Sequence, residues 1–96
     1  MECRILAFST EDCPACDVAK PIVKKIANNA GIQVNDLDPT NEIELAQMFG
    51  VNIMPTFVLL DGEGEFIESI EGFIDEKTAQ SFISLVEPEQ KKILAV

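Results

Sequence analysis

Residues 13–16 read Cys13-Pro14-Ala15-Cys16, and they lie between a short apolar run and a segment with helical periodicity. The run, residues 4–8, predicts a buried strand, and Pro14 suits the first position of a helix, where a missing N–H costs nothing. A thiol at a helix N-terminus faces unpaired backbone N–H groups, which favour the reactive thiolate. This stretch therefore predicts a strand, a turn and a helix that begins with a reactive thiol.

The hydrophobic pattern on either side of this stretch predicts seven elements in the order βαβαββα. Strands are expected at residues 4–8, 32–37, 56–60 and 65–70. Helices are expected at residues 14–29, 42–49 and 76–86, the last capped by Asp75. A strand, a helix and a parallel strand wind right-handedly, and Asp61-Gly62-Glu63-Gly64 favours an antiparallel hairpin. The order thus predicts an α/β fold, a four-stranded mixed sheet with helices on both faces.

Apolar residues at helical spacing predict which side chains face the core. In the first helix these are Val18, Ala19, Ile22, Val23, Ile26 and Ala27. In the two later helices they are Ile43, Leu45, Ala46 and Phe49, then Ala79, Phe82, Ile83 and Val86. Four phenylalanines are expected between the sheet and the helices: Phe57, Phe66, Phe73 and Phe82. The alternative for Phe73 is a position that borders the active site.

Length and hydrophobicity predict one domain over residues 1–96, because 47% of the chain is hydrophobic and suffices for one core. Residues 89–96, after Pro88, are expected to add a helical turn or a frayed tail. No apolar run approaches the ~20 residues that span a membrane, and the first residues lack the pattern of a signal peptide. We therefore expect a soluble, cytoplasmic protein.

Charge and composition exclude several classes of function. The formal net charge of −10 disfavours binding to nucleic acids and to anionic membranes, which attract basic surfaces. The chain has no histidine, so it cannot build a Ser–His–Asp triad or a Cys2His2 zinc site. Cys3 is the one other cysteine, and we expect it in the core rather than in a site. One CxxC in a chain with a βαβ pattern is typical of a redox motif.

A second feature is Pro55, which directly precedes the third expected strand. Proline in sheets is confined to edges, strand starts and bulges, so Pro55 suits a strand start. The functional interpretation is a cis peptide after Met54 that holds this loop beside the thiols.

Together these residues resemble the thioredoxin superfamily over nearly the whole chain. Its members place CxxC after the first core strand, a kinking proline in the helix, a cis-proline before a later strand and a glycine after the last strand. The corresponding residues here are Cys13, Cys16, Pro21, Pro55 and Gly72. The extra N-terminal strand and helix of full thioredoxins are missing, so the chain is similar to glutaredoxins and other compact redoxins.

The resemblance implies a thioredoxin-like fold and a dithiol–disulfide oxidoreductase without a cofactor. Cys13 would be the attacking thiolate and Cys16 the resolving thiol. The backbone of Met54 would pair with a substrate strand, and Pro55 would also keep metal from the thiols. Pro14, Ala15 and Gly72 are the remaining expected substrate contacts. The implied partners are proteins with disulfides and a thioredoxin reductase or glutathione as electron donor, with the chain acting as a monomer.

The chain departs from the thioredoxin pattern around the motif. Ala7 replaces a buried acid of the first strand, Asp36 replaces a lysine of the second, and Asp12 replaces a tryptophan. Proton transfer at Cys16 would then use water or Glu11.

These residues leave the electron donor and the role open. Glutaredoxins hold glutathione with basic residues near the motif, where this chain offers Lys20. We expect protein disulfides to be preferred to glutathione. The sequence is also compatible with a non-catalytic binding module and with an oxidant or isomerase.

Overall fold

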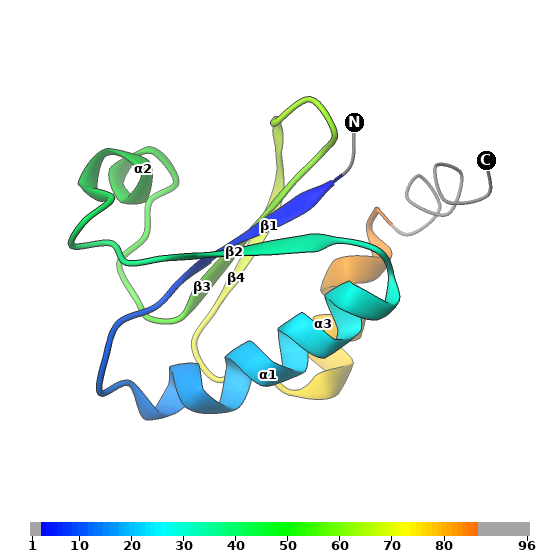
Figure 1. Cartoon of the computed structure of the whole chain (residues 1–96), viewed down its shortest axis with the longest axis horizontal. Coiled ribbons are helices and arrows are strands. Elements are labelled where there is room, and N and C mark those ends of the chain that lie inside the picture. Colours follow the sequence, from blue (N-terminus) through cyan, green and yellow to red (C-terminus); the bar gives the residue numbers. More distant parts are fainter. Residues whose placement is uncertain (1–2, 87–96) are drawn as a thin grey trace.

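The central sheet has the strand order β2-β1-β3-β4, in which β1 pairs parallel with β2 and antiparallel with β3 (Figure 1). The computed structural model describes residues 3–86, so the expectations for Pro88 and residues 89–96 lie outside the described residues. The strands are β1 (Arg4–Phe8), β2 (Gln33–Leu37), β3 (Thr56–Leu60) and β4 (Phe66–Glu71). The helices are α1 (Pro14–Asn29), α2 (Ile43–Met48) and α3 (Glu76–Ser84). The predicted order βαβαββα is confirmed.

Strand register brings the two sequence motifs to one edge of the sheet. Phe8, the last residue of β1, pairs with Thr56, the first residue of antiparallel β3. The chain leaves β1 toward Cys13 at the same edge where it enters β3 from Pro55. The topology therefore juxtaposes segments that are about forty residues apart in sequence.

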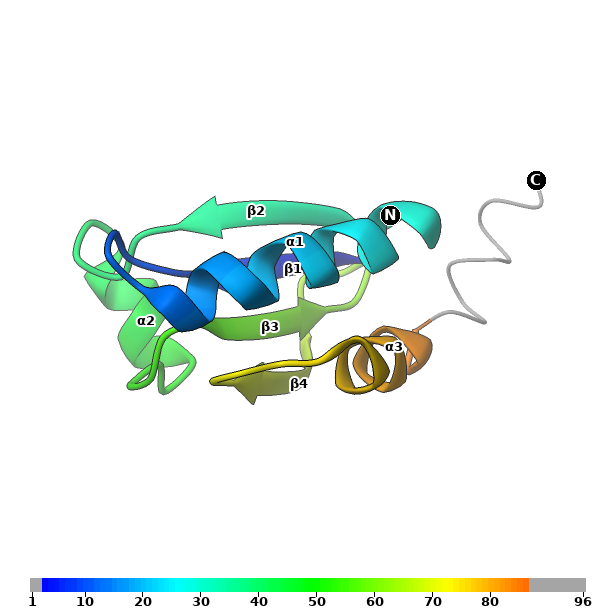
Figure 2. The ribbon, with the colours of Figure 1, turned by 90° about the horizontal axis from the view of Figure 1, so that it is seen from below.

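Helices cover both faces of the sheet, as predicted. Figure 1 shows α1 and α3 below the strands and α2 above one end of them, and in Figure 2, seen from below, α1 crosses in front of the sheet. One buried cluster joins the sheet to α1 and α3 through residues such as Ile5, Phe57, Leu59, Val23 and Phe82. A smaller cluster joins the opposite face to α2 through Leu6, Phe8, Ala46, Val58 and Leu60. No helix within residues 3–86 is both long and apolar enough to cross a membrane.

Capping residues mark the ends of the two longer helices. Cys13 is the N-cap of α1, and its sulfur accepts a hydrogen bond from the backbone N–H of Cys16. After α1, Gly31 adopts a positive φ of 74°, a conformation that glycine takes without a steric penalty. Asp75 caps α3, as predicted, because its carboxylate accepts the N–H of Thr78 at 2.8 Å.

Four residues predicted to be buried are exposed, which corrects the expected core. Val18, Ile43, Phe66 and Phe73 expose between 52% and 77% of their surface. The buried side of α1 follows Cys16, Ala19, Val23 and Ala27, and Val18 lies off this line. Phe66 stacks on Phe49 with ring centroids 6.3 Å apart, outside the buried clusters. Phe73, for which a position bordering the active site is the alternative expectation, lies directly after Gly72 between β4 and α3 and is 77% exposed.

Candidate active site

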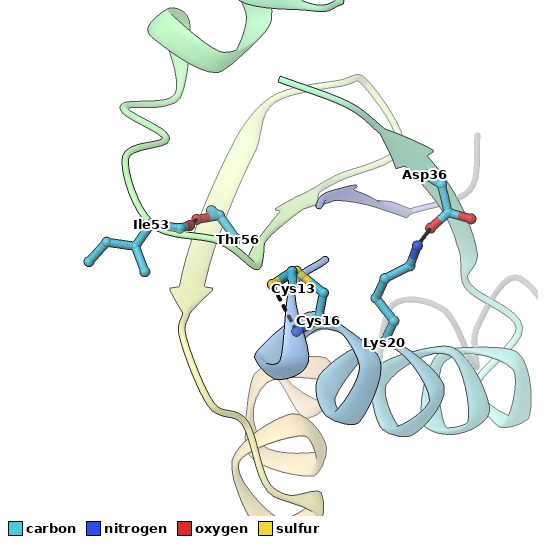
Figure 3. Close-up of a disulfide and its surroundings, with 6 residues drawn as sticks. All are labelled: Cys13, Cys16, Lys20, Asp36, Ile53 and Thr56. Carbon is cyan, nitrogen blue, oxygen red and sulfur yellow. Dashed lines mark hydrogen bonds and ion pairs between the residues drawn. A yellow bond between two sulfur atoms is a disulfide. The ribbon is translucent and has the colours of Figure 1, made fainter. Parts of the chain in front are cut away.

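The two cysteines of the motif form a disulfide at the start of α1 (Figure 3). Their Cα atoms are 5.2 Å apart, and the N–H of Cys16 donates to the sulfur of Cys13 at 3.1 Å. Cys16 is buried, with 2% of its surface exposed, whereas Cys13 is partly exposed. A reagent from solution therefore reaches the sulfur of Cys13 more readily than that of Cys16.

The residue before the pair has an unusual backbone conformation. Asp12 has a positive φ of 55°, in the left-handed region that non-glycine residues seldom occupy. This turn directs the chain from β1 into α1, so that Cys13 takes the extended conformation of an N-cap. Aspartate tolerates the left-handed region better than most side chains. The sequence predicts a turn between the first strand and the first helix, but not this conformation of Asp12.

The loop before β3 contains the cis peptide bond between Met54 and Pro55. Pro55 is fully buried, and the hydroxyl of Thr56 donates to the carbonyl of Ile53 at 2.5 Å. Figure 3 shows the segment from Ile53 to Thr56 on one side of the disulfide. Within residues 3–86, the backbone of Met54 makes no hydrogen bond to other backbone groups. Its N–H and C=O therefore have the capacity to pair with an extended peptide.

Gly72 joins the end of β4 to the same loop. Its N–H donates to the carbonyl oxygen of Pro55 at 2.9 Å, and its φ is 84°. A side chain at this position would meet no atom within 4 Å, so the positive φ, rather than lack of space, favours glycine. Gly72 thus fixes where the chain turns from β4 toward α3, next to the cis peptide.

An ion-pair cluster lies on the other side of the disulfide. Asp36 of β2 accepts from Lys24 at 2.7 Å and pairs with Lys20 at 3.2 Å, both on α1 (Figure 3 shows Lys20). Burial alone would raise the pKa of Asp36, but hydrogen bonds from Lys24 and Lys20 outweigh it and hold the pKa below its usual value. Asp36 is also the direct cross-strand neighbour of Ala7. An acid is thus present one strand away from Ala7, and it is held by two lysines.

The structure places the predicted site residues in one region, with unequal access. Cys13, Cys16, Pro14 and Ala15 share the first turn of α1, with Pro14 exposed and Ala15 partly exposed. Met54, Pro55 and Gly72 are linked through the loop before β3. Sequence reasoning missed the pairing of Asp36 with the lysines, which depends on the register of β2 beneath α1. The spacing of Lys20 and Lys24 by one helical turn was the available signal.

Comparisons by sequence identify one family. A family model described as Thioredoxin matches residues 2–86. No curated protein sequence matches the chain. The matched range includes both cysteines, the cis peptide and Gly72.

Comparisons of structure give the same result. A mutant thioredoxin from Halobacterium salinarum aligns with a TM-score of 0.77 and 27% identity, over 88% of this chain and 74% of that chain. The germline-specific thioredoxin Deadhead from Drosophila melanogaster aligns with a TM-score of 0.77 and 25% identity, over 88% and 81% of the two chains. A thioredoxin from Malassezia sympodialis aligns with a TM-score of 0.72 and 26% identity, over 90% and 76%.

Proposed function

The chain belongs to the thioredoxin family, and on that premise we propose that it reduces disulfides in other proteins with electrons from a thioredoxin reductase. It is a thiol–disulfide oxidoreductase whose redox pair is Cys13–Cys16. The observation that carries the proposal is the pair itself, with an accessible sulfur and a buried one at the start of a helix.

The proposed cycle assigns one role to each sulfur. The thiolate of Cys13 attacks one sulfur of the substrate disulfide, which breaks that bond, forms a mixed disulfide and releases a substrate thiol after protonation. The thiolate of Cys16 then attacks the sulfur of Cys13. This step releases the second substrate thiol and leaves the Cys13–Cys16 disulfide, so two electrons have passed to the substrate. The reductase returns two electrons to restore the dithiol.

The proton of Cys16 needs an acceptor in this cycle, because Ala7 supplies none. We propose that water or Glu11 takes it, since Glu11 is an exposed residue of the turn before the pair. Glu11 also lines a hollow of about 290 Å³ together with Lys20 and Asp36, among others, so water reaches this carboxylate. Met54 is proposed to hold the substrate chain through its backbone N–H and C=O, with Pro14, Ala15, Pro55 and Gly72 bordering the bound segment.

Glutathione is the less suitable electron donor. Lys20, the basic residue nearest the motif, is engaged with Asp36 at 3.2 Å, so it is not free for a carboxylate of glutathione. The residues before Cys13 are Glu11 and Asp12, which would repel such a ligand. A protein reductase avoids both difficulties, and the reducing cytoplasm is the proposed compartment for this cycle.

Coupled reduction of insulin tests the proposed function. The oxidised protein is mixed with insulin, NADPH and a thioredoxin reductase, and NADPH consumption is followed. A parallel reaction contains glutathione and glutathione reductase instead. The proposal predicts turnover with the thioredoxin reductase and much slower turnover with glutathione; the reverse preference would contradict it.

The protein is expected to elute as a monomer in size-exclusion chromatography.

A further inference from the structure

A groove of about 410 Å³ lies between the first half of α1 and the segment that leads from β4 into α3. Its apolar lining residues are Val18, Ile22, Phe73 and Ile74. Phe73 exposes 77% of its surface and Val18 exposes 52%, although both are large apolar side chains. Such a patch beside a reactive centre indicates an interaction surface.

Two lining residues of the groove follow residues of the redox site closely along the chain. Val18 lies two residues after Cys16 on α1, and Phe73 directly follows Gly72. The hydrogen bond from Gly72 to Pro55 ties this segment to the loop that contains the cis peptide. Figure 1 shows the connection from β4 to α3 passing beside the N-terminal half of α1. A peptide whose disulfide reaches Cys13 would therefore have neighbouring side chains within reach of the groove.

The charged side chains that line the groove itself are acidic, and Lys77, which does not line it, acts on Asp75 through its charge. Asp75 and Glu76 line it, and among the described residues no lysine or arginine contributes to its lining. Lys25 instead lines the adjoining hollow, next to Ile22 and Glu76. Hydrogen bonds from the backbone and side chain of Thr78 hold the pKa of Asp75 below its usual value, so this carboxylate stays charged at neutral pH. An occupant with a basic side chain is complementary to this rim, and an acidic occupant is repelled.

We propose that this groove selects protein substrates in which the reacting cysteine has a large apolar residue and a lysine or arginine within a few positions. The apolar side chain covers Phe73 and Val18, and the basic side chain lies against Asp75 and Glu76. This specificity rests on the proposed function, because it concerns substrates of the same dithiol.

Synthetic peptide disulfides test this specificity. Three peptides carry the same cysteine, flanked by leucine and arginine, by leucine and glutamate, or by serine and arginine. Rate constants for their reduction by the reduced protein are measured against hydroxyethyl disulfide, a small uncharged reference. We expect the peptide with leucine and arginine to react about tenfold faster than the peptide with serine and arginine, since burial of one apolar side chain is sufficient for such a factor. It should also react faster than the peptide with leucine and glutamate, because the carboxylates of the groove attract arginine and repel glutamate.

Two variants assign the preference to the groove. Phe73→Ala should reduce the preference for leucine over serine, and Glu76→Gln should reduce the preference for arginine over glutamate. Matched controls elsewhere on the molecule are Leu85→Ala, whose leucine is 55% exposed, and Glu63→Gln in the β3–β4 turn. Both controls should keep the wild-type preferences.

The outcomes separate the two proposals. Equal rates for the three peptides, or unchanged preferences in Phe73→Ala and Glu76→Gln, would overturn the groove proposal. If the protein still reduces hydroxyethyl disulfide in that case, the proposed function stands. If the protein reduces none of the peptides and no hydroxyethyl disulfide, the proposed function itself fails.

Discussion

The two sulfurs of the redox pair differ in access although their Cα atoms are only 5.2 Å apart. Cys13 is the N-cap of α1 and is partly exposed, whereas Cys16 is directed into the core. The difference follows from helix geometry. A residue one turn into α1 lies against the sheet, whereas the N-cap lies at the end of the helix, where solvent reaches it. This asymmetry separates the attacking thiol from the resolving one.

Replacement of each cysteine should therefore give a different result. Cys16→Ser removes the resolving thiol, so mixed disulfides with substrate proteins should accumulate and be visible on non-reducing gels. Cys13→Ser should lower the rate of insulin reduction by about a hundredfold or more, and no mixed disulfides should accumulate. Accumulation of adducts in Cys13→Ser instead would mean that Cys16 is the attacking residue.

Asp36 predicts a specific dependence of stability on pH. Its pKa lies below the usual value of 3.8 because the hydrogen bonds and charges of two lysines outweigh its partial burial. The stabilisation is thus complete above that pH and is lost as pH falls through the lowered value of the folded state. Because the carboxylate is 46% exposed and screened, we expect only about 0.5 kcal/mol at neutral pH.

Urea unfolding of wild type and Asp36→Asn at neutral pH and near pH 2 measures this contribution. The difference between the two proteins should shrink at the lower pH. A difference that stays constant would show that the pair with Lys20 and Lys24 does not stabilise the fold. Comparison with the variant removes the effect of the other acidic residues, which titrate in both proteins.

At the scale of elements, β3 is a strand that contributes side chains to the buried clusters on both faces of the sheet. All five of its residues are buried, and the four after Thr56 alternate between the cluster under α1 and α3 and the cluster under α2. The sequence Thr56-Phe57-Val58-Leu59-Leu60 predicted this element well, because an uninterrupted apolar run is typical of a strand covered on both sides.

Leu59→Ala should destabilise the protein by about 2–5 kcal/mol, since it removes a fully buried side chain and leaves a cavity. Leu85→Ala, at a leucine that is 55% exposed, is the matched control and should change stability by about 0.5 kcal/mol or less. Unfolding by urea compares the two variants. Similar losses of stability would contradict the placement of Leu59 in the core.

Some elements were less predictable from sequence. The predicted fourth strand, residues 65–70, is observed at Phe66–Glu71, a shift of one residue at each end. Val18 and Phe73 were expected in the core because apolar spacing cannot tell a buried face from an exposed groove. The spacing of Lys20 and Lys24 was a signal for a shared partner, but the residues around Asp36 do not identify it as that partner, since the register of β2 brings them together. The motif residues were recognisable because their chemistry depends on short local patterns: a helix start and a proline before a strand.

The whole molecule carries a net charge of −10, which should influence encounters with charged substrates. Electrostatic attraction acts over a Debye length of about 30 Å at 0.01 M salt but only about 8 Å at 0.15 M. Reduction of a basic peptide disulfide should therefore slow several-fold between these conditions. Stopped-flow rates with hydroxyethyl disulfide provide the uncharged control. Equal salt dependence for the two substrates would refute electrostatic steering.

The reduction potential of the Cys13–Cys16 pair tests the central claim most directly. The protein is equilibrated in buffers of defined thiol and disulfide ratio, and the oxidised fraction is counted after acid quenching and alkylation. We predict one two-electron transition near the value for thioredoxin, about −270 mV, that is absent in Cys13→Ser. A potential near about −120 mV, as in a strong oxidant, or no intramolecular disulfide at any ratio, would contradict the account.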